Sequence, residues 1–478
     1  MLLLPQLDEQ GEQPLYVQLY SHIKQEIVAG RLQVQARIPS VRKLAELLSI
    51  STTPVEMAYH QLVAEGFIES KPKSGYFVQN LSDPYVQLGN SLQSPLESRM
   101  ERSFPARDTT NYRYDFHLSK NDFTHFPFKV WRKLMIRVVA EEQKDLLFYG
   151  DPQGEKGLRE EIAKYLHQFR GVVCSPDQIV IGAGSHVLLT FLCLMLRPRF
   201  SQIGIENPGY PLITTTFRQH GFGVVPISLD EDGIDLGELY QSGVRTVYVT
   251  PSHQFPRGML MPVSKRLQLL EWAKQTGGYI IEDDYDGEFR YHGKPIASLQ
   301  GLLPDSHVVY LGGFSKSLAP AVRISYMVLP EDLLAVYHQL EYKLMFEQSS
   351  SPLFQRVVEL FMKEGHWEKH IRKMRNVYRK KHDALIQAIQ DSFGDQAAII
   401  GKGAGFHVLL RVNSHLSERE MSAIAREAGI RISPAFFTWD QQPEELPIEF
   451  FVGFGGLDVP DIERGIRRLR EVWSGLVT

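Results

Sequence analysis

Apolar residues in the first part of the chain recur at helical spacing. The first run consists of Tyr16, Leu19, Tyr20, Ile23 and Ile27, and Gly30 follows it. Residues three or four apart share one face of a helix and glycine ends one, so the run predicts a helix of about four turns. Two shorter apolar faces follow, at 44–48 and 55–62. The turn Ser49–Ser51 joins them, with Ser51 in the capping position, which predicts a helix-turn-helix.

A hairpin is expected directly after these helices. Phe67–Glu69 and Tyr76–Val78 are short apolar segments on either side of the basic, glycine-containing sequence Lys71–Gly75. Helices and hairpin together predict a mainly α winged helix. The same geometry also occurs in small helical domains that touch no DNA, so both interpretations stay open here.

In this head region, the net charge and the placement of the basic residues point in different directions on DNA binding. Residues 1–80 contain 7 Lys+Arg and 8 Asp+Glu, a balance that does not indicate DNA binding. However, the run Arg31–Lys43 is basic and free of acidic residues, and Lys71 and Lys73 stand on the predicted wing. Phosphate contacts require only such a local patch, so the placement favours a nucleic-acid partner.

Three segments of the head resemble the GntR-type winged helix of bacterial repressors and activators: Arg37–Ala45, Ser51–Val55 and Leu62–Gly66. The resemblance implies operator DNA as a partner. The residues expected to contact it are Arg42, Lys43, Thr52, Thr53, Lys71 and Lys73. That family commonly has a longer basic residue where Thr52 stands and an arginine-rich wing where this chain has lysine.

The remainder of the chain begins after a linker. Periodicity is lost over 81–112, where Ser, Pro, Asn and Gln are frequent, and thirty residues exceed an ordinary loop. From Tyr114 on, short apolar runs alternate with amphipathic helical stretches, which predicts a mainly parallel α/β sheet. Five such runs, at 178–181, 202–205, 246–249, 278–281 and 308–311, are each followed by polar or glycine residues. Ligands collect at the carboxyl ends of parallel strands, so one composite site is expected there.

The residues after these runs fit pyridoxal phosphate (PLP), which needs an amine, a carboxylate at its ring nitrogen and phosphate donors. Lys316 is expected to form the Schiff base, Asp283 to hold the ring nitrogen protonated, and Tyr285 to bond the phenolic oxygen. The phosphate is expected at a helix start, where free amides and the helix dipole attract anions. Its binding residues would be Gly184, Ser185 and His186, with Ser315 and Arg323.

Other interpretations were weighed for these residues. Lys316 stands between two serines and could be a solvated loop lysine, but it follows a buried run and precedes Arg323. The acidic run 282–288 could bind a hard cation, yet an EF-hand beginning at Glu282 would place Gly293 where glutamate is required. The sixteen histidines show no ligand spacing, so no metal site is predicted.

This set of residues resembles the fold-type I, aspartate-aminotransferase-like enzymes over Tyr114 to Thr478. Joined to a GntR-type head, the entire chain resembles the MocR/GabR family of regulators. By that resemblance Tyr210 stacks near the cofactor ring, and His253, with Gln254, lies near the phenolic oxygen. Tyr149 would reach the phosphate of the other subunit of a head-to-tail homodimer. Plain structural roles for Tyr149, Tyr210 and His253 are the alternatives.

Two positions depart from the family's pattern. The family's amino-acid-binding members carry a carboxylate-binding arginine near the C-terminus, at the position where this chain has Phe451. Arg431 is a substitute that nothing in the sequence directs at the site. Gly313 stands where a phosphate-binding Ser or Thr is often found, which leaves Ser315, Arg323 and the helix amides for that role.

The predicted organisation is multidomain. A winged helix-turn-helix occupies 1–80 and a linker 81–112. A PLP-binding α/β large domain of the fold-type I transferase-like class occupies 113–340. The charged, helical segment from Glu341 to Asp391 then opens a smaller α+β domain over 341–478, which would close over the cofactor.

Composition limits the class of protein and its cellular compartment. The chain has 478 residues, 43% of them apolar, with 52 basic and 56 acidic side chains, which excludes disorder and a generic polybasic protein. Two cysteines fit a reducing compartment, and Met1–Gln6 lacks the basic and long apolar segments of a secretory signal. The most apolar stretch, 187–196, is too short to span a bilayer and reads as a buried helix. We therefore expect a cytoplasmic protein without a membrane role.

The function predicted is that of a PLP-dependent transcriptional regulator that binds operator DNA and senses an amine-bearing effector at Lys316. An amino acid, a D-amino acid, a dipeptide and PLP itself are the effectors considered, and Phe451 disfavours a simple α-amino acid. A working aminotransferase with a DNA-tethering head is the main alternative. A DNA-binding protein whose core has lost its cofactor is the third.

Overall fold

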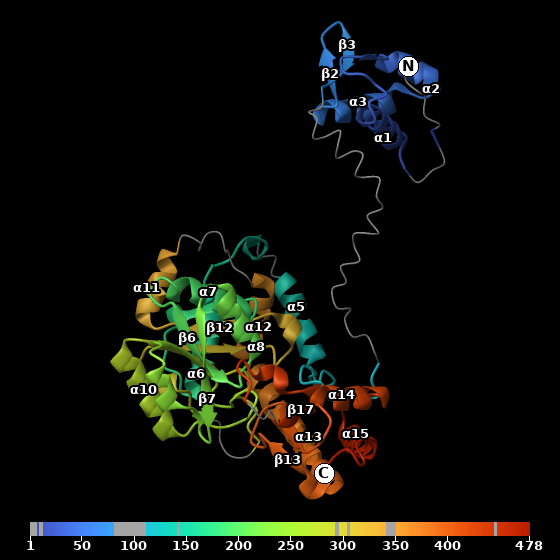
Figure 1. Ribbon diagram of the computed structural model, residues 1–478. Coiled ribbons are helices and arrows are strands. Elements are labelled where there is room, and N and C mark those ends of the chain that lie inside the picture. The colour runs from blue at the N-terminus through green and yellow to red at the C-terminus, as the bar shows by residue number, and fades with distance from the viewer. Residues whose placement is uncertain are drawn as a thin grey trace. The chain divides into compact units, whose positions relative to one another are not determined.

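A computed structural model describes residues 7–8, 13–80, 111–140, 144–291, 296–303, 306–340, 350–443 and 447–478. The chain forms two compact units, Met1–Thr110 and Asn111–Thr478 (Figure 1). Most of the predicted linker, 81–110, lies outside the described residues. No described helix is both long and apolar enough to cross a membrane.

The first unit is a winged helix. Its helices are α1 (Leu15–Val28), α2 (Val41–Leu48) and α3 (Thr52–Ala64), and its strands β1 (Arg37–Ile38), β2 (Ile68–Lys71) and β3 (Gly75–Val78) form an antiparallel sheet in the order β1-β3-β2. The predicted apolar faces meet in one core, in which Leu19, Leu44, Tyr59 and Leu62 are fully buried. Ser40 caps α2 by accepting a hydrogen bond from the Lys43 amide at 3.3 Å. Ser51 precedes α3 as predicted, but its side chain makes no capping bond.

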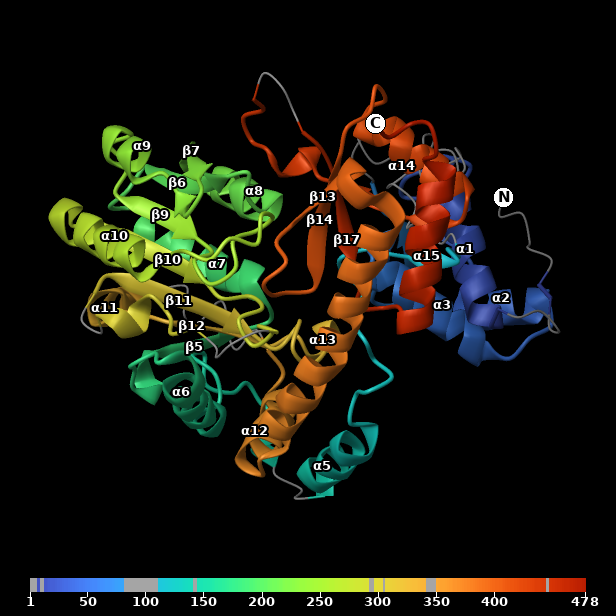
Figure 2. The same cartoon turned by 90° about the horizontal axis from the view of Figure 1, so that it is seen from below.

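The second unit is built on an eight-stranded sheet with the order β5-β12-β11-β10-β9-β6-β7-β8 (Figure 2). Five neighbouring strands pair in parallel: β7 (Gly223–Asp230), β6 (Gln202–Asn207), β9 (Thr246–Val249), β10 (Tyr279–Asp283) and β11 (Val308–Gly313). β5 (Ile179–Gly182) is the edge strand beside β12. β12 (Ser325–Val328) is antiparallel to β5 and β11, and β8 (Gly233–Ile234) is antiparallel to β7. The mainly parallel sheet expected from the alternating pattern is therefore present.

Both faces of this sheet are covered, because neighbouring strand residues point to opposite sides. Ile281 packs with α7 (Ser185–Leu196), α8 (Pro211–Gln219) and α11 (Glu331–Gln339), whereas Ile280 packs with α9 (Leu236–Gln241) and α10 (Val263–Thr276). The apolar stretch 187–196 lies in α7 and is mostly buried, as predicted. This two-sided burial fixes the strands whose carboxyl ends form the site.

A second, four-stranded antiparallel sheet has the order β13-β14-β17-β16. Its strands are β13 (Ala397–Ile400), β14 (His407–Val412), β16 (Ser433–Pro434) and β17 (Ile448–Gly453). In Figure 2 the helices α13 (His366–Phe393), α14 (Glu418–Glu427) and α15 (Val459–Val472) lie on one side of it. This α+β layer corresponds to the smaller domain expected at the C-terminal end.

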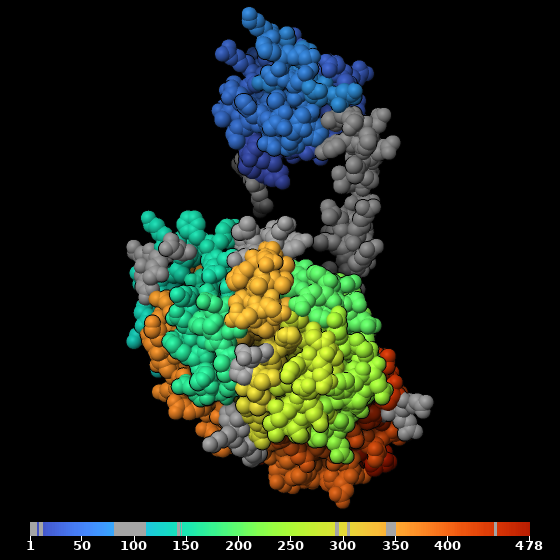
Figure 3. All heavy atoms as spheres, turned by 90° about the vertical axis from the view of Figure 1, so that its left-hand side faces the viewer, coloured from blue at the N-terminus to red at the C-terminus, as the bar shows by residue number. Residues whose placement is uncertain are grey.

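Some elements cross the boundary predicted between 340 and 341. Residues 341–349 of the predicted charged segment lie outside the described residues. The rest forms α12 (Pro352–Lys363) and α13, and Gly365 between them has a positive φ of 73°. α12 packs against α5 (Phe128–Ala140) and α6 (Lys156–Arg170), which precede the boundary. Conversely, β4 (Tyr114–Asp115) pairs with β15 (Ile430–Arg431). In Figure 3 the teal residues that include α5 and α6 form part of the surface of the second unit.

Candidate functional site

The carboxyl ends of the large-sheet strands surround a cavity of about 330 Å³. It brings together every residue predicted for the cofactor site except His253, Gln254 and Tyr149. The predicted residues that line it are Gly184, Ser185, His186, Tyr210, Asp283, Tyr285, Ser315, Lys316 and Arg323. Strand-end residues that are far apart in sequence therefore share one site, as the parallel topology requires.

One end of the cavity is built for an anion. Gly184 precedes α7 with a φ of 119°, and Ser185 and His186 begin the helix, so unpaired amides and the helix dipole face this end. Arg323 donates to the Ala183 carbonyl beside it. A Cβ atom at Gly184 would lie 2.4 Å from Nη2 of Arg323, so any side chain there would displace the guanidinium.

Lys316 lies in the loop after β11 with its amine inside the cavity. Burial lowers the pKa of this amine, and the negative charge of Asp286 opposes that effect. Its Nζ donates to the Leu118 carbonyl at 3.2 Å and lies 5.9 Å from the centre of the Phe406 ring. The Asn121 amide donates to the carbonyls of Ser315 and Lys316, at 3.4 and 3.3 Å, and so holds the loop. A lysine with a lowered pKa is a better nucleophile at neutral pH.

Asp283 ends β10 at the floor of the cavity. Burial raises the pKa of its carboxyl to about 7, and Asp284, Asp286 and Glu282 add to the rise. Tyr248 of β9 donates a short hydrogen bond to it. A partly buried carboxyl without a positive partner among the described residues is suited to a ligand that brings a cationic or N–H group.

Tyr285 and His253 form a chain of contacts with Asp286. The Tyr285 hydroxyl lies 3.0 Å from Nδ1 of His253, and that nitrogen lies 2.8 Å from Oδ2 of Asp286. His253 is buried behind Tyr285 and does not line the cavity. Gln254 is also buried and donates to the Pro208 carbonyl at 3.0 Å. Neither residue lines the cavity, whereas the family resemblance places both near the phenolic oxygen.

Several residues that line or support the cavity were not predicted from the sequence. Tyr248 and Thr250 line the cavity, and Thr250 donates at 2.6 Å to Glu206, whose pKa burial raises to about 7. Tyr248 and Glu206 lie at or near strand ends, and this position could have predicted that they belong to the site. Asn121 lies between β4 and α5, and nothing in its sequence context indicates that it reaches the lysine loop.

The two departures from the family's pattern have visible consequences. Phe451 is fully buried in β17 and stacks on Phe255, with ring centres 5.5 Å apart and planes at 17°. Arg431 lies 3.7 Å from Asp115 and does not line the cavity, so the structure does not bring it to the site. Gly313 lines the cavity opposite Ser325 of β12.

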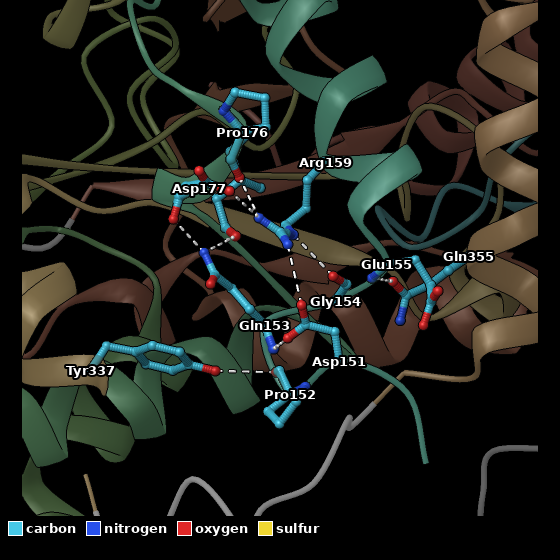
Figure 4. A network of polar contacts seen from close by, with 11 residues as sticks. Asp151, Pro152, Gln153, Gly154, Glu155, Arg159, Pro176, Asp177, Tyr337 and Gln355 are labelled. Carbon is cyan, nitrogen blue, oxygen red and sulfur yellow. Dashed lines mark hydrogen bonds and ion pairs between the residues drawn. The ribbon is translucent and has the colours of Figure 1, made fainter. Parts of the chain in front are cut away.

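Tyr149 is 79% exposed and is not part of the cavity of its own chain. The turn that follows it is held firmly (Figure 4). Buried Arg159 donates to the Gly154 carbonyl at 3.0 Å and lies 3.2 Å from Asp151, and Tyr337 donates to the Pro152 carbonyl at 3.1 Å. The turn therefore presents Tyr149 to solvent from a fixed support.

Two members of the acidic run 282–288, Asp284 and Glu282, are engaged within the protein. Asp284 forms a buried ion pair with Arg170 at 2.6 Å. Glu282 accepts from the amides of Leu299 and Gln300 at 2.7 and 3.0 Å. In the part of the chain that the structure describes, no group of three or more His, Cys, Asp or Glu side chains is arranged to hold a metal ion.

The residues predicted to contact DNA lie on α2, α3 and the wing of the first unit. Arg42, Lys43, Thr52, Thr53 and Lys73 are exposed. Lys71 is half-buried, lies 2.7 Å from Glu69 and donates to Gln35 at 3.2 Å. Neither Arg42 nor Lys73 forms an ion pair with another described residue, so their charges are available to phosphates.

Comparisons with known proteins agree with both units. The family model for aminotransferase class I and II matches residues 115–449, and the model for bacterial regulatory proteins of the gntR family matches 15–78. An uncharacterized HTH-type transcriptional regulator of Bacillus subtilis, YhdI, is 41% identical over the whole of both chains. The probable rhizopine catabolism regulatory protein MocR of Rhizobium meliloti is 31% identical, over 98% of this chain and 96% of that protein.

Among solved structures, the kynurenine aminotransferase of Pyrococcus horikoshii covers 81% of this chain and 99% of its own, with a TM-score of 0.69 and 24% identity. At that identity the likeness concerns the fold. The fold is that of an aminotransferase, as the family resemblance implied.

Proposed function

We propose a sensing mechanism for this chain, which belongs to the MocR/GabR family of transcriptional regulators and joins a gntR-family DNA-binding head to an aminotransferase class I and II core. The cavity around Lys316 and Asp283 would take pyridoxal phosphate, and an amine-bearing effector would enter there. The single observation that carries the proposal is one cavity that combines a partly buried lysine of lowered pKa, a partly buried carboxyl of raised pKa and an anion site at a helix start.

These residues fit the cofactor at each of its polar groups. The phosphate would lie at the amides of Gly184–His186 with Arg323, and the aldehyde carbon would be within reach of the Lys316 amine. Asp283 would face the ring nitrogen, whose proton and positive charge would return the carboxyl to its ionised form. When bound, the cofactor supplies an aldehyde that bonds reversibly to amines and a ring that withdraws electrons from them.

The residues of the chain would orient and protect this chemistry. Tyr285, held by His253 and Asp286, would donate a hydrogen bond to the phenolic oxygen. The lowered pKa of Lys316 leaves a larger fraction of its amine neutral at pH 7, so it can exchange with an effector amine. Tyr210, beside Phe255 at 5.2 Å between ring centres, would pack near the cofactor ring.

A homodimer, arranged head to tail, is the assembly we propose. The apolar side chains of Leu147, Phe148 and Tyr149 are each more than 70% exposed in one chain, a cost that burial in a partner would remove. Tyr149 on its fixed turn would then reach the partner's phosphate site. We place the protein in the cytoplasm, where such a regulator meets DNA.

Regulation would follow from a shift between two arrangements of the two heads. An effector that binds one arrangement more tightly changes its population, and the affinity for operator DNA changes by the same coupling energy. The four-stranded antiparallel sheet is the element placed to respond, because Phe406, just before its strand β14, and His407, the first residue of β14, line the cavity.

The proposal is tested by adding PLP to the purified full-length protein. We expect a visible absorbance band that is absent in the Lys316→Ala variant. The absence of a band in the wild-type protein would refute cofactor binding and favour a core that has lost its cofactor. A band that persists in Lys316→Ala would refute the assignment of the lysine.

A working aminotransferase is the alternative that the fold itself favours. It predicts sustained conversion of an amino acid with a keto acid, whereas a regulator predicts at most a slow half-reaction. Single-turnover and steady-state measurements on the same preparation separate the two. Rapid steady-state transamination would contradict a purely regulatory function.

A further inference from the structure

The wall of the cavity beside the Lys316 amine is apolar and aromatic. Leu118, Phe255 and Phe406 line it, and Phe451 supports it from behind by stacking on Phe255. Phe451 also packs with Leu118 and Tyr285 in one buried cluster. A group attached to an effector amine at Lys316 would therefore meet carbon atoms on this side.

His407 also lines this side of the cavity, and its imidazole is held neutral. Burial lowers the pKa of His407 to about 3, with a further contribution from His253. Its Nε2 lies 3.4 Å from the Pro256 carbonyl, which can only accept, so Nε2 carries the proton. Nδ1 is then an acceptor and offers no hydrogen to a carboxylate.

The lysine and the arginine that line the cavity both have other roles, so neither is left to bind a carboxylate of the effector. Among the described residues that line it, Lys316 and Arg323 are the only lysine and arginine. Arg323 is bonded at the start of α7, where the phosphate would lie. A carboxylate placed against Phe406 and Phe255 would lose its hydration without gaining a partner, and such burial is costly.

We propose, on the basis of the proposed function, that the effector is a primary amine with an apolar or aromatic substituent and no carboxylate on the carbon that bears the amine. Such a ligand would bond through its nitrogen at Lys316 and bury its substituent against Leu118, Phe255 and Phe406. Amino acids with the same side chain would carry an anion into this wall.

A matched ligand series tests this class. The PLP-loaded full-length protein is titrated with 2-phenylethylamine and with L- and D-phenylalanine, which differ from it only by the carboxylate, and the visible band of the bound cofactor is followed. The same titrations of free PLP correct for intrinsic reactivity. We expect the corrected affinity for the amine to exceed that for either amino acid by about tenfold or more. Equal or tighter binding of either amino acid would overturn the proposal.

A substitution in the wall gives a second test. Phe451→Arg introduces a cation and is expected to shift the preference at least tenfold towards phenylalanine, whereas Phe451→Leu keeps the wild-type preference. A folded Phe451→Arg variant with an unchanged preference would also overturn the proposal. Since Phe451 is buried, Phe451→Arg could fail to fold, and the ligand series on the wild type then decides alone. Loss of the cofactor band in the wild type would instead refute the proposed function.

A separate observation concerns the phosphate end of the cavity. Gly313 of β11 and Ser325 of β12 are direct cross-strand partners, and both line the cavity. A Cβ atom at Gly313 would lie 2.7 Å from Oγ of Ser325, so the serine side chain occupies the space that a side chain at 313 would need. Within the described residues, the Ser325 hydroxyl makes no hydrogen bond, and the residue is 5% exposed.

We infer that Ser325 supplies the phosphate-binding hydroxyl that Gly313 lacks. The hydroxyl is carried on the neighbouring strand and faces the same cavity as Ser315, Arg323 and the amides of α7. This inference also rests on cofactor binding at the site, and it assigns a residue that sequence comparison with the family would pass over.

The test compares PLP with pyridoxal, which lacks the phosphate, in equilibrium titrations. Ser325→Ala is expected to weaken PLP about tenfold, because a hydrogen bond to a charged group is lost, and to leave pyridoxal binding within about twofold. Equal effects on both ligands, or none on PLP, would overturn the inference.

An exchange of the two residues provides the matched control. Gly313→Ser alone is expected to weaken PLP because of the 2.7 Å contact with Ser325. The double variant Gly313→Ser/Ser325→Gly returns one hydroxyl to the cavity and is expected to bind PLP more tightly than Ser325→Gly alone, by about tenfold. A double variant no better than Ser325→Gly would overturn the inference. Thermal unfolding of each variant checks that it folds.

Discussion

Asp283→Asn is a nearly isosteric change that removes the charge from the floor of the cavity. In the wild-type protein without cofactor, the Asp283 carboxyl is partly buried at the floor of the cavity, and burial raises its pKa from 3.8 to about 7. The amide of asparagine can keep an oxygen towards Tyr248, which donates to this position. The variant therefore separates the effect of charge from the effect of shape.

The pKa of Asp283 fixes the sign and size of the effect. Between about pH 4 and pH 7 the folded protein holds a proton on Asp283 that the unfolded chain has released, so the free energy of unfolding falls as the pH rises. A rise from 3.8 to about 7, at 1.36 kcal/mol per pH unit, corresponds to a loss on the order of 4 kcal/mol above pH 7. The asparagine of Asp283→Asn does not titrate, so the variant does not lose this stability. The other carboxyls are the same in both proteins, so their effects cancel in the comparison.

The assay is denaturant unfolding of both proteins without PLP, at pH 5 and at pH 8. Asp283→Asn is expected to be more stable than the wild type at pH 8, by up to about 4 kcal/mol, and the difference should shrink towards pH 5. Saturating PLP should stabilise the wild type more than the variant, because only the carboxylate can pair with a protonated ring nitrogen. A variant less stable than the wild type at pH 8, or a difference independent of pH, would refute the reasoning.

Further predictions concern the head, the phosphate end and the dimer. Arg42→Ala and Lys73→Ala should each weaken operator binding and make its salt dependence shallower by about one unit per lost phosphate contact, measured by anisotropy across a salt series; unchanged affinity in both would place the interface elsewhere. Gly184→Ala should reduce PLP affinity by at least tenfold, because its Cβ would lie 2.4 Å from Arg323, and wild-type affinity in an absorbance titration would contradict the anion site. If Tyr149 contacts the cofactor site of the partner, a mixture of Tyr149→Ala and Lys316→Ala chains should form hybrid dimers with one intact site. These hybrids should bind PLP more tightly than Tyr149→Ala alone. An affinity equal to that of Tyr149→Ala would argue against contact between subunits.

Much of the site was predictable because parallel strands place their last residues at one edge. Asp283, Lys316 and Gly184 each follow a buried apolar run, and this rule alone brought them together. The winged helix was equally visible, since its apolar faces have simple helical spacing and meet in one core.

What could not be predicted depends on contacts between distant segments. Asn121 reaches the lysine loop from the region before α5, and β4 pairs with β15 across more than three hundred residues. No local pattern encodes such contacts, because they arise only when the chain has folded. The position of Ser325 opposite Gly313 likewise depends on the register of β11 and β12, which the sequence alone does not reveal.

We propose that occupancy of the Lys316 cavity controls DNA binding by the head. It is tested most directly by measuring the affinity of the PLP-loaded protein for promoter DNA from beside its own gene, with and without a saturating amine that shifts the cofactor band. We predict a change of at least fivefold in the wild type, the lower end of ordinary coupling between two sites, and no change in Lys316→Ala. An affinity unaffected by the amine in the wild type, or equally affected in Lys316→Ala, would contradict the claim.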